Sequence, residues 1–283
     1  MTANPAQPPR EMSADVNEAS MKHIVSFSSG LSSALTAVRV MERYGRENTT
    51  LVFMDTRFED DDNYRFMADF ERVFGVEILR ITEGRTPYEV AKDEHYIPNS
   101  RVASCTRRLK IEPFRAYLAT LPKPVTVHIG YDFSEMHRCA PTRANYEGLG
   151  YEVEFPLLWK PYEFRPYEQI CRDDWGVEPP RMYRMGYTHA NCGGRCVKQG
   201  HGDWLRTLAN FPARYAEVEE WERQMRLNPV NAAYAILKRQ TADGITPLTL
   251  EQLRIEYEAG RIGQAGLFDL DAASACVVCG IGG

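Results

Sequence analysis

The feature that most constrains this fold is a strand, a serine-rich turn and a helix in direct succession over residues 22–40 (KHIVSFSSGLSSALTAVRV). The apolar run at 24–27 is typical of a buried strand, and apolar residues then recur at a helical spacing over 35–41. The small residues of 28–33 let the backbone approach a ligand closely. Because free N–H groups and the dipole at a helix start favour negative charge, the turn predicts an anion site. A serine-rich cap on an ordinary strand–helix unit is the alternative interpretation.

Further strands and helices follow in alternation. Apolar runs at 50–55, 76–81 and 124–129 predict buried strands, and phenylalanines spaced by four predict a helix over 63–74. This alternation predicts an α/β fold with a mostly parallel, doubly wound sheet. Ligands bind such sheets at the carboxyl ends of the strands, where the serine-rich turn and Asp55 fall.

A cysteine followed by cations forms a second candidate site. Cys105 precedes Arg107, Arg108 and Lys110. Neighbouring cations lower a thiol pKa and favour the thiolate, which attacks electrophiles or binds metals. The same cations are suited to holding a phosphate or sulfate. An exposed basic helix start with an incidental cysteine is the alternative.

Two more cysteines, Cys192 and Cys196, flank a Gly-Gly-Arg segment. Glycines beside cysteines let backbone N–H groups approach sulfur, which suits an iron–sulfur or zinc site. Such sites usually have four ligands, so Cys105 is a third candidate and His189, another cysteine or an open position the fourth. Two structural thiols on a glycine-rich turn are the alternative.

Overall composition excludes several classes of protein. The net charge of -5 does not favour a large nucleic-acid footprint, and no apolar run reaches the roughly 18–20 residues of a membrane span. Seven cysteines in 283 residues, several of them closely spaced, favour thiol or metal chemistry in a reducing compartment. We therefore expect a cytoplasmic protein without membrane contact. The oligomeric state stays open.

The chain divides into four predicted segments. Residues 1–20 are polar and Pro/Ala-rich, which predicts a disordered tail and not a signal peptide. Residues 21–200 contain the α/β domain, and the apolar spacing in 201–270 predicts a helical extension. Residues 271–283 predict a mobile Cys/Gly-rich tail.

That tail carries a C-x-x-C pair, Cys276 and Cys279. The pair has two interpretations: thiols that deliver or resolve a persulfide, or metal ligands that close over Cys192 and Cys196. Both interpretations require the tail to reach the candidate site.

The serine-rich turn resembles the S-G-G-x-[DT]-S turn of the PP-loop superfamily, which contains the ATP pyrophosphatases and the phosphoadenosine-phosphosulfate (PAPS) reductases. Ser29 stands where the first glycine is usual, and Ser32 where Asp or Thr is usual. Three later segments resemble the PAPS-reductase-like group in the same order: the strand end 52–56 (with Arg57 replacing a glycine), the C-x-x-x-x-K-x-x-P segment 105–113 and the G-x-x-x-x-E-x-x-R turn 130–138.

The resemblance implies a PP-loop, Rossmann-like domain that binds an adenine nucleotide, either ATP or a PAPS-type sulfonucleotide. It implies catalytic roles for Cys105, Lys110 and a tail thiol, Cys276 or Cys279. The implied nucleotide contacts are Ser26, Ser28, Ser29, Gly30, Ser32, Ser33, Asp55, Arg107, Gly130, Glu135 and Arg138.

Three functions are compatible with these motifs. The first is a sulfonucleotide reductase that receives electrons from a thioredoxin-like partner. The second is an ATP-dependent sulfurtransferase that thiolates a nucleic-acid base or backbone, with Mg²⁺ on the pyrophosphate and sulfur from a 4Fe-4S cluster at Cys105, Cys192 and Cys196. The third is a non-catalytic nucleotide-binding module that holds such a cluster or zinc.

Overall fold

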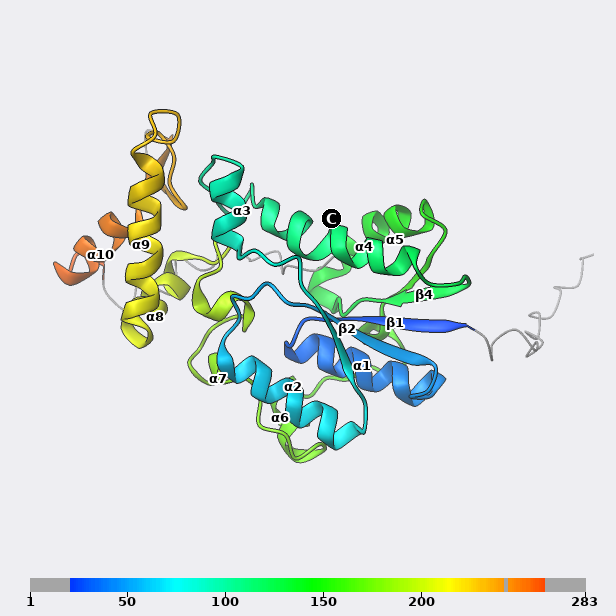
Figure 1. Ribbon diagram of the computed structural model, residues 1–283. Helices are drawn as coiled ribbons and strands as arrows, with labels where there is room; N and C mark the ends of the chain where they lie inside the picture. Colours follow the sequence, from blue (N-terminus) through cyan, green and yellow to red (C-terminus); the bar gives the residue numbers. More distant parts are fainter. Residues whose placement is uncertain (1–20, 242–243, 263–283) are drawn as a thin grey trace, which may run out of the picture.

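A five-stranded parallel sheet forms the centre of the molecule, and its strand order is β3-β2-β1-β4-β5 (Figure 1). The computed structural model describes residues 21–241 and 244–262. The strands are β1 (Lys22–Phe27), β2 (Thr49–Met54), β3 (Ile78–Ile81), β4 (Val125–His128) and β5 (Glu152–Glu154). The sequence prediction of a doubly wound α/β fold is confirmed.

Side chains alternate between the two faces of the sheet, as the two-residue period of a strand requires. On β1 and β2, Val25, Leu51 and Phe53 pack into one hydrophobic core, and Ile24 and Val52 pack into the other. Both faces are therefore buried, which explains why the strands are continuous apolar runs in the sequence.

Helices cover each face of the sheet (Figure 1). The first core is closed by α1 (Leu31–Tyr44), α2 (Asp61–Phe74) and α6 (Tyr167–Asp173). The opposite core is closed by α4 (Glu112–Ala119) and α5 (Cys139–Glu147). Helix α2 begins two residues before the predicted start, because the Asp60 side chain accepts a hydrogen bond from the Asp62 N–H and caps it.

A group of helices lies beyond the carboxyl ends of the strands, on the left in Figure 1. It consists of α3 (Pro87–Asp93), α8 (His201–Asn210), α9 (Pro212–Arg226) and α10 (Leu250–Glu258). Their hydrophobic core also contains Cys192 and Cys196, so packing is continuous across the predicted boundary at residue 200.

The extension also contains an antiparallel hairpin, β6 (Leu237–Thr241) and β7 (Gly244–Leu248), which the sequence did not predict. Its strands are largely polar, so they lack the apolar alternation that indicates a buried strand. Buried Glu222 of α9 joins the hairpin to α10, because its carboxylate accepts the N–H groups of Ile236 and Leu250, each at 2.7 Å.

Short helical turns complete the described chain. They are the π-helical turn η2 (Thr106–Ile111), the 3-10 turns η3 (Phe133–Arg138), η4 (Pro156–Leu158) and η5 (Asn191–Gly194), and the helical turn α7 (Arg181–Arg184). Across residues 21–241 and 244–262, every helix is too short or too polar to span a lipid bilayer.

Candidate functional site

The serine-rich turn opens into a cavity of about 390 Å³ at the carboxyl edge of the sheet. The chain runs from β1 outward to β2 and β3 on one side, and β4 and β5 lie on the other, so β1 and β4 flank the topological switch point. Crevices at such points are the usual ligand sites of open α/β sheets. The cavity is lined by Ser28, Gly30, Leu31, Ser32, Ser33, Asp132, Tyr167, Glu168, Tyr183, Tyr187, Thr188, His189 and Asn191.

Hydrogen bonds within the turn fix its shape. The Ser33 hydroxyl accepts from the Ser28 N–H at 3.0 Å and donates to the Gly30 carbonyl at 2.8 Å. Ser29 is fully buried with φ +58°, and its hydroxyl donates to the Ser28 carbonyl. Of the predicted nucleotide contacts in the turn, Ser28, Gly30, Ser32 and Ser33 therefore face the cavity, and Ser29 supports the turn from within.

The opposite wall of the cavity comes from residues 183–191, more than 150 positions away in the chain. The Tyr183 hydroxyl accepts a hydrogen bond from the Leu31 N–H, at 3.3 Å, and so contacts the first turn of α1. His189 and Asn191 are buried and line the cavity. The sequence indicated His189 only as a fourth metal ligand, and the structure places it instead beside the serine turn.

The turn after β4 supplies a third side. Gly130 packs so closely that a Cβ there would lie 2.7 Å from the Thr36 hydroxyl and 3.0 Å from the Ser32 carbonyl oxygen. Asp132 lines the cavity. Arg138 and Glu135, both predicted nucleotide contacts, pair with each other. Arg138 is buried over the Tyr131 ring, 4.2 Å from the centroid, and neither residue is part of the cavity lining.

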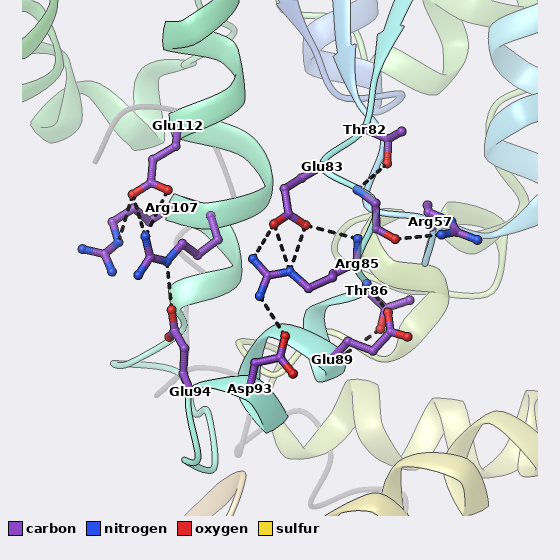
Figure 2. A network of polar contacts seen from close by, with 12 residues as sticks. Arg57, Thr82, Glu83, Arg85, Thr86, Glu89, Asp93, Glu94, Arg107 and Glu112 are labelled. Atoms are coloured by element: carbon purple, nitrogen blue, oxygen red, sulfur yellow. Dashed lines mark hydrogen bonds and ion pairs between the residues drawn. The ribbon is translucent and has the colours of Figure 1, made fainter.

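Asp55 and Ser26 also lie outside the lining of this cavity. Asp55 directly follows β2 and accepts hydrogen bonds from the Tyr64 hydroxyl, at 2.8 Å, and from the Arg57 N–H, at 2.7 Å. Arg57 has φ +56°, and its guanidinium donates to the Gly84 carbonyl (Figure 2). Asp55, the residue after β2, is thus hydrogen-bonded within its own loop and to α2 rather than facing the larger cavity.

Three cysteines meet in a second, smaller cavity of about 20 Å³. Cys105, the N-cap of η2, and Lys110 within η2 reach it from the turn before α4, and Cys192 and Cys196 reach it from the glycine-rich turn. A π turn joins residues five apart, so η2 carries Cys105 and Lys110 to the same side, where an α-helix would direct them apart. The structure therefore brings together the three predicted metal ligands.

The segment Cys192–Cys196, called the cysteine turn from here on, is held against the loop after β2 by a hydrogen bond and a stacking contact. Cys192 (φ +56°) donates its backbone N–H to the buried Glu59 carboxylate at 2.7 Å. The Arg195 guanidinium stacks on Phe58, 3.5 Å from the ring centroid. Hydrogen bonding to Cys196, burial and the charge of Glu59 raise the pKa of the Cys192 thiol well above its usual value. The positive charge of Lys110 acts in the opposite direction and lowers this pKa. Glu59 carried no motif that could have revealed this role.

Arg107 does not line either cavity. Arg107 lies beside Glu112 (Figure 2). Its Nε is 3.6 Å from Glu112 Oε1, and both side chains are exposed. Arg108 pairs with Glu94 and Glu112. The spacing of these arginines from Cys105 suggested an anion site, but the π turn directs only Lys110 inward.

The donor set around the small cavity suits a thiophilic metal, since three thiols are common ligands of zinc and iron. Within residues 21–241 and 244–262, however, no three His, Cys, Asp or Glu side chains are grouped as a metal site. The space holds about one water molecule, so a multi-atom cluster requires the thiols to move apart. Cys276 and Cys279 lie outside the described residues.

One short segment forms a wall of both cavities. Asn191 lines the larger cavity, and the next residue, Cys192, lines the smaller one. The larger cavity also gains Tyr183, Asp132 and Glu168, which the sequence did not single out as ligand contacts. The available signal for Asp132 was its place inside the Gly130–Arg138 turn, and for Tyr183 its place nine residues before Cys192; Glu168 lies near neither motif.

No family model matches the chain. An uncharacterized protein of Methanocaldococcus jannaschii is similar to it, with 30% identity over 95 residues. The matched stretch makes up 34% of this chain and 19% of that protein, so the chain spans less than two thirds of the relative's length. Because that protein is itself uncharacterized, the similarity assigns no activity.

Proposed function

We propose that this protein is a PAPS-reductase-like enzyme of the PP-loop type, which binds an adenine nucleotide in the larger cavity and carries out sulfur chemistry beside it. The observation that carries the proposal is the shared wall at Asn191 and Cys192, which sets a three-thiol pocket next to a serine-rich anion turn. Reactive sulfur and a nucleotide would then meet within one part of the fold.

Two backbone conformations support the family resemblance. Ser29 and Arg57 stand where the resembling motifs have glycine, and both hold the left-handed backbone that glycine adopts most easily. The chain thus keeps the turn geometry that those glycines favour, although the residue types differ. Phosphate groups would be bound by the N–H groups that follow Leu31 in the first turn of α1, since the Leu31 N–H donates to Tyr183, and by the hydroxyls of Ser28 and Ser32.

The first reaction that suits this arrangement is sulfonucleotide reduction. An enzyme thiolate attacks the sulfuryl sulfur, an S–S bond forms, and the S–O bond to the nucleotide phosphate breaks. A thioredoxin-like dithiol then attacks the enzyme sulfur and becomes a disulfide as sulfite leaves. Buried Lys110 would stabilise a thiolate of Cys105 or negative charge on the sulfuryl group, and Cys276 or Cys279 would be the alternative nucleophile.

The second reaction is ATP-dependent sulfur transfer, which the gathering of three thiols in one pocket favours. ATP adenylates an acceptor oxygen and pyrophosphate leaves, a departure that Mg²⁺ would assist. The outer sulfur of a persulfide, formed on one pocket cysteine by a sulfur donor, then displaces AMP. A second pocket thiol attacks the remaining S–S bond, which releases the thiolated product and leaves an enzyme disulfide for a thioredoxin-like dithiol to reduce. A nucleic-acid base or backbone is the acceptor class in this case. In the metal-dependent form of this reaction, the three thiols would not carry the persulfide. Cys105, Cys192 and Cys196 would instead hold zinc or, if they move apart, a 4Fe-4S cluster, which would supply an open site for sulfur.

Binding of nucleotide is tested by titration calorimetry with ATP and with PAPS. Ser28→Asp places a negative charge in the phosphate cradle and should abolish binding of both. The matched control is Ser100→Asp, an exposed serine, which should bind as the parent does. Unchanged binding by Ser28→Asp would contradict the assignment of this cavity.

The chemistry is tested by metal and acid-labile sulfide analysis of anaerobically purified protein. Iron and sulfide that are lost in Cys105→Ser, Cys192→Ser and Cys196→Ser, but kept in Cys139→Ser, support the cluster and sulfur transfer. Zinc indicates a structural site. The reductase is supported by two results together: the protein contains no metal, and it releases sulfite from PAPS in a reaction that the double variant Cys276→Ser, Cys279→Ser has lost.

A further inference from the structure

One histidine in the larger cavity lacks the partners that buried polar groups normally have. The His189 side chain lines the cavity, the residue is only 6% exposed, and neither Nδ1 nor Nε2 forms a hydrogen bond to a described residue. A buried polar group without a partner is costly, and native structures contain few of them.

Each of the other enclosed histidines has at least one hydrogen-bonded nitrogen, although His128 Nδ1 also lacks a hydrogen-bond partner. His23 Nδ1 and His128 Nε2 are hydrogen-bonded to each other at 3.0 Å. His201 Nε2 lies 3.0 Å from the Lys238 carbonyl oxygen. His189 therefore differs from them in that neither of its ring nitrogens has a partner among the described residues, although its side chain lines a cavity that a ligand can enter.

The chemistry of the surrounding walls identifies the class of ligand. Across the cavity are the hydroxyls of Ser28 and Ser32 and the start of α1, a 14-residue helix whose dipole favours negative charge. An imidazole N–H is a donor suited to the same charge. Asp132 and Glu168 also line the cavity. Because carboxylates only accept hydrogen bonds and repel an anion, these two side chains are not the groups that bind the anionic oxygen.

We propose that His189 is a ligand-binding residue that donates a hydrogen bond to an anionic oxygen, phosphoryl or sulfuryl, of the molecule held by the serine turn. The assignment rests on the proposed nucleotide site and adds a contact from the far wall. Since His189 lies three residues before Cys192, the same contact would position the cysteine turn relative to the bound anion.

The test is His189→Phe, which keeps a ring of similar shape and removes both nitrogens. We expect ATP and adenosine 5′-phosphosulfate to bind about 10- to 100-fold more weakly, and adenosine, which has no anionic group, to bind unchanged. Without ligand, the thermal midpoint should rise by about 2–4 °C, because the variant buries no unpaired polar group. His189→Gln, which retains a donor, should recover part of the affinity.

His201→Gln is the matched control and should bind ATP as the parent does. A parental affinity for ATP in His189→Phe overturns this assignment but leaves the nucleotide site intact. Equal losses for ATP and adenosine, with a lowered thermal midpoint, indicate a packing role and also overturn it. If the parent protein itself binds neither anionic nucleotide, the proposed function fails together with the assignment.

Discussion

Ser29 and Arg57 both hold left-handed backbone beside the candidate site, with φ values of +58° and +56°. Residues with a Cβ pay roughly 1–2 kcal/mol for this conformation. Local hydrogen bonds compensate: the Ser29 hydroxyl donates to the Ser28 carbonyl, and the Arg57 N–H donates to Asp55. Strain of this kind persists where the surroundings over-determine the backbone, as they do at binding sites.

The side chain at position 29 therefore affects the free energy of unfolding through the cost of holding the backbone at positive φ. We expect Ser29→Gly to fold as well as the parent, since the relieved strain offsets the lost hydroxyl bond. Ser29→Val should destabilise by about 2–4 kcal/mol, because a β-branched residue is disfavoured at positive φ and this site is fully buried. Urea unfolding at constant pH measures both, and equal midpoints for the two variants would contradict the explanation.

At the scale of secondary-structure elements, β1, β4 and α1 are joined by a buried polar cluster. His23 of β1 stacks on Tyr44 of α1, with 3.7 Å between the ring centroids, and hydrogen-bonds to His128 of β4. Burial, with the nearby charges of His23 and Arg43, lowers the pKa of His128 to about 3. Burial likewise lowers the pKa of His23.

These histidines make stability depend on pH. The unfolded chain binds a proton at each near pH 6.5, whereas folded His128 stays neutral down to about pH 3. The stabilisation from keeping these histidines neutral is therefore fully present above pH 6.5. As the pH falls from 6.5 toward 3, protonation of His128 in the unfolded chain lowers the free energy of unfolding by about 1.4 kcal/mol per pH unit. Urea midpoints between pH 7 and 4 should show this slope. It should flatten in His128→Leu and persist in the control His137→Leu, which alters an exposed histidine.

At the scale of the whole molecule, one buried carboxylate ties the sheet domain to the C-terminal helices. Asp60 is fully buried at the start of α2 and pairs with Arg181 of α7 at 2.8 Å and with Arg214 of α9 at 2.6 Å. Arg214 also donates to the Gly193 carbonyl in the cysteine turn. The same ion cluster thus holds the extension and the wall shared by the two cavities.

Asp60→Asn should lower the free energy of unfolding by about 3 kcal/mol, because two guanidinium groups lose their buried counter-charge. We also expect faster hydrogen exchange in residues 191–196 and at the start of α9, since the clamp on the cysteine turn is weakened. The exposed neighbour Asp61→Asn is the control and should change little. If Asp60→Asn unfolds and exchanges like the parent, the cluster does not join the two parts.

The sequence by itself determined the elements whose signal is local. Apolar runs and helical spacing predicted the parallel sheet, the helix over 63–74 and the turn at 28–33, because each depends on residues within a few positions of one another. Residue type also suggested that Cys105, Cys192 and Cys196 share a site; they line one cavity, and their role as metal ligands stays a prediction. Residues 201–262 were less predictable, since the hairpin buries only one apolar pair among its described residues, Leu237 and Leu248, and lacks the alternation that marks a strand.

Only the tertiary structure decided which side chains share a space. Nothing in the sequence around His189 or Asn191 indicates that they face a turn more than 150 residues earlier, or that Cys192 faces the other cavity. Arg107 and Lys110 are equivalent as cations in the sequence, and the π turn alone sends one outward to Glu112 and the other into the thiol pocket. Contacts between distant segments place His189, Asn191 and Cys192, whereas the two cations are placed by a local π turn that residue spacing did not predict.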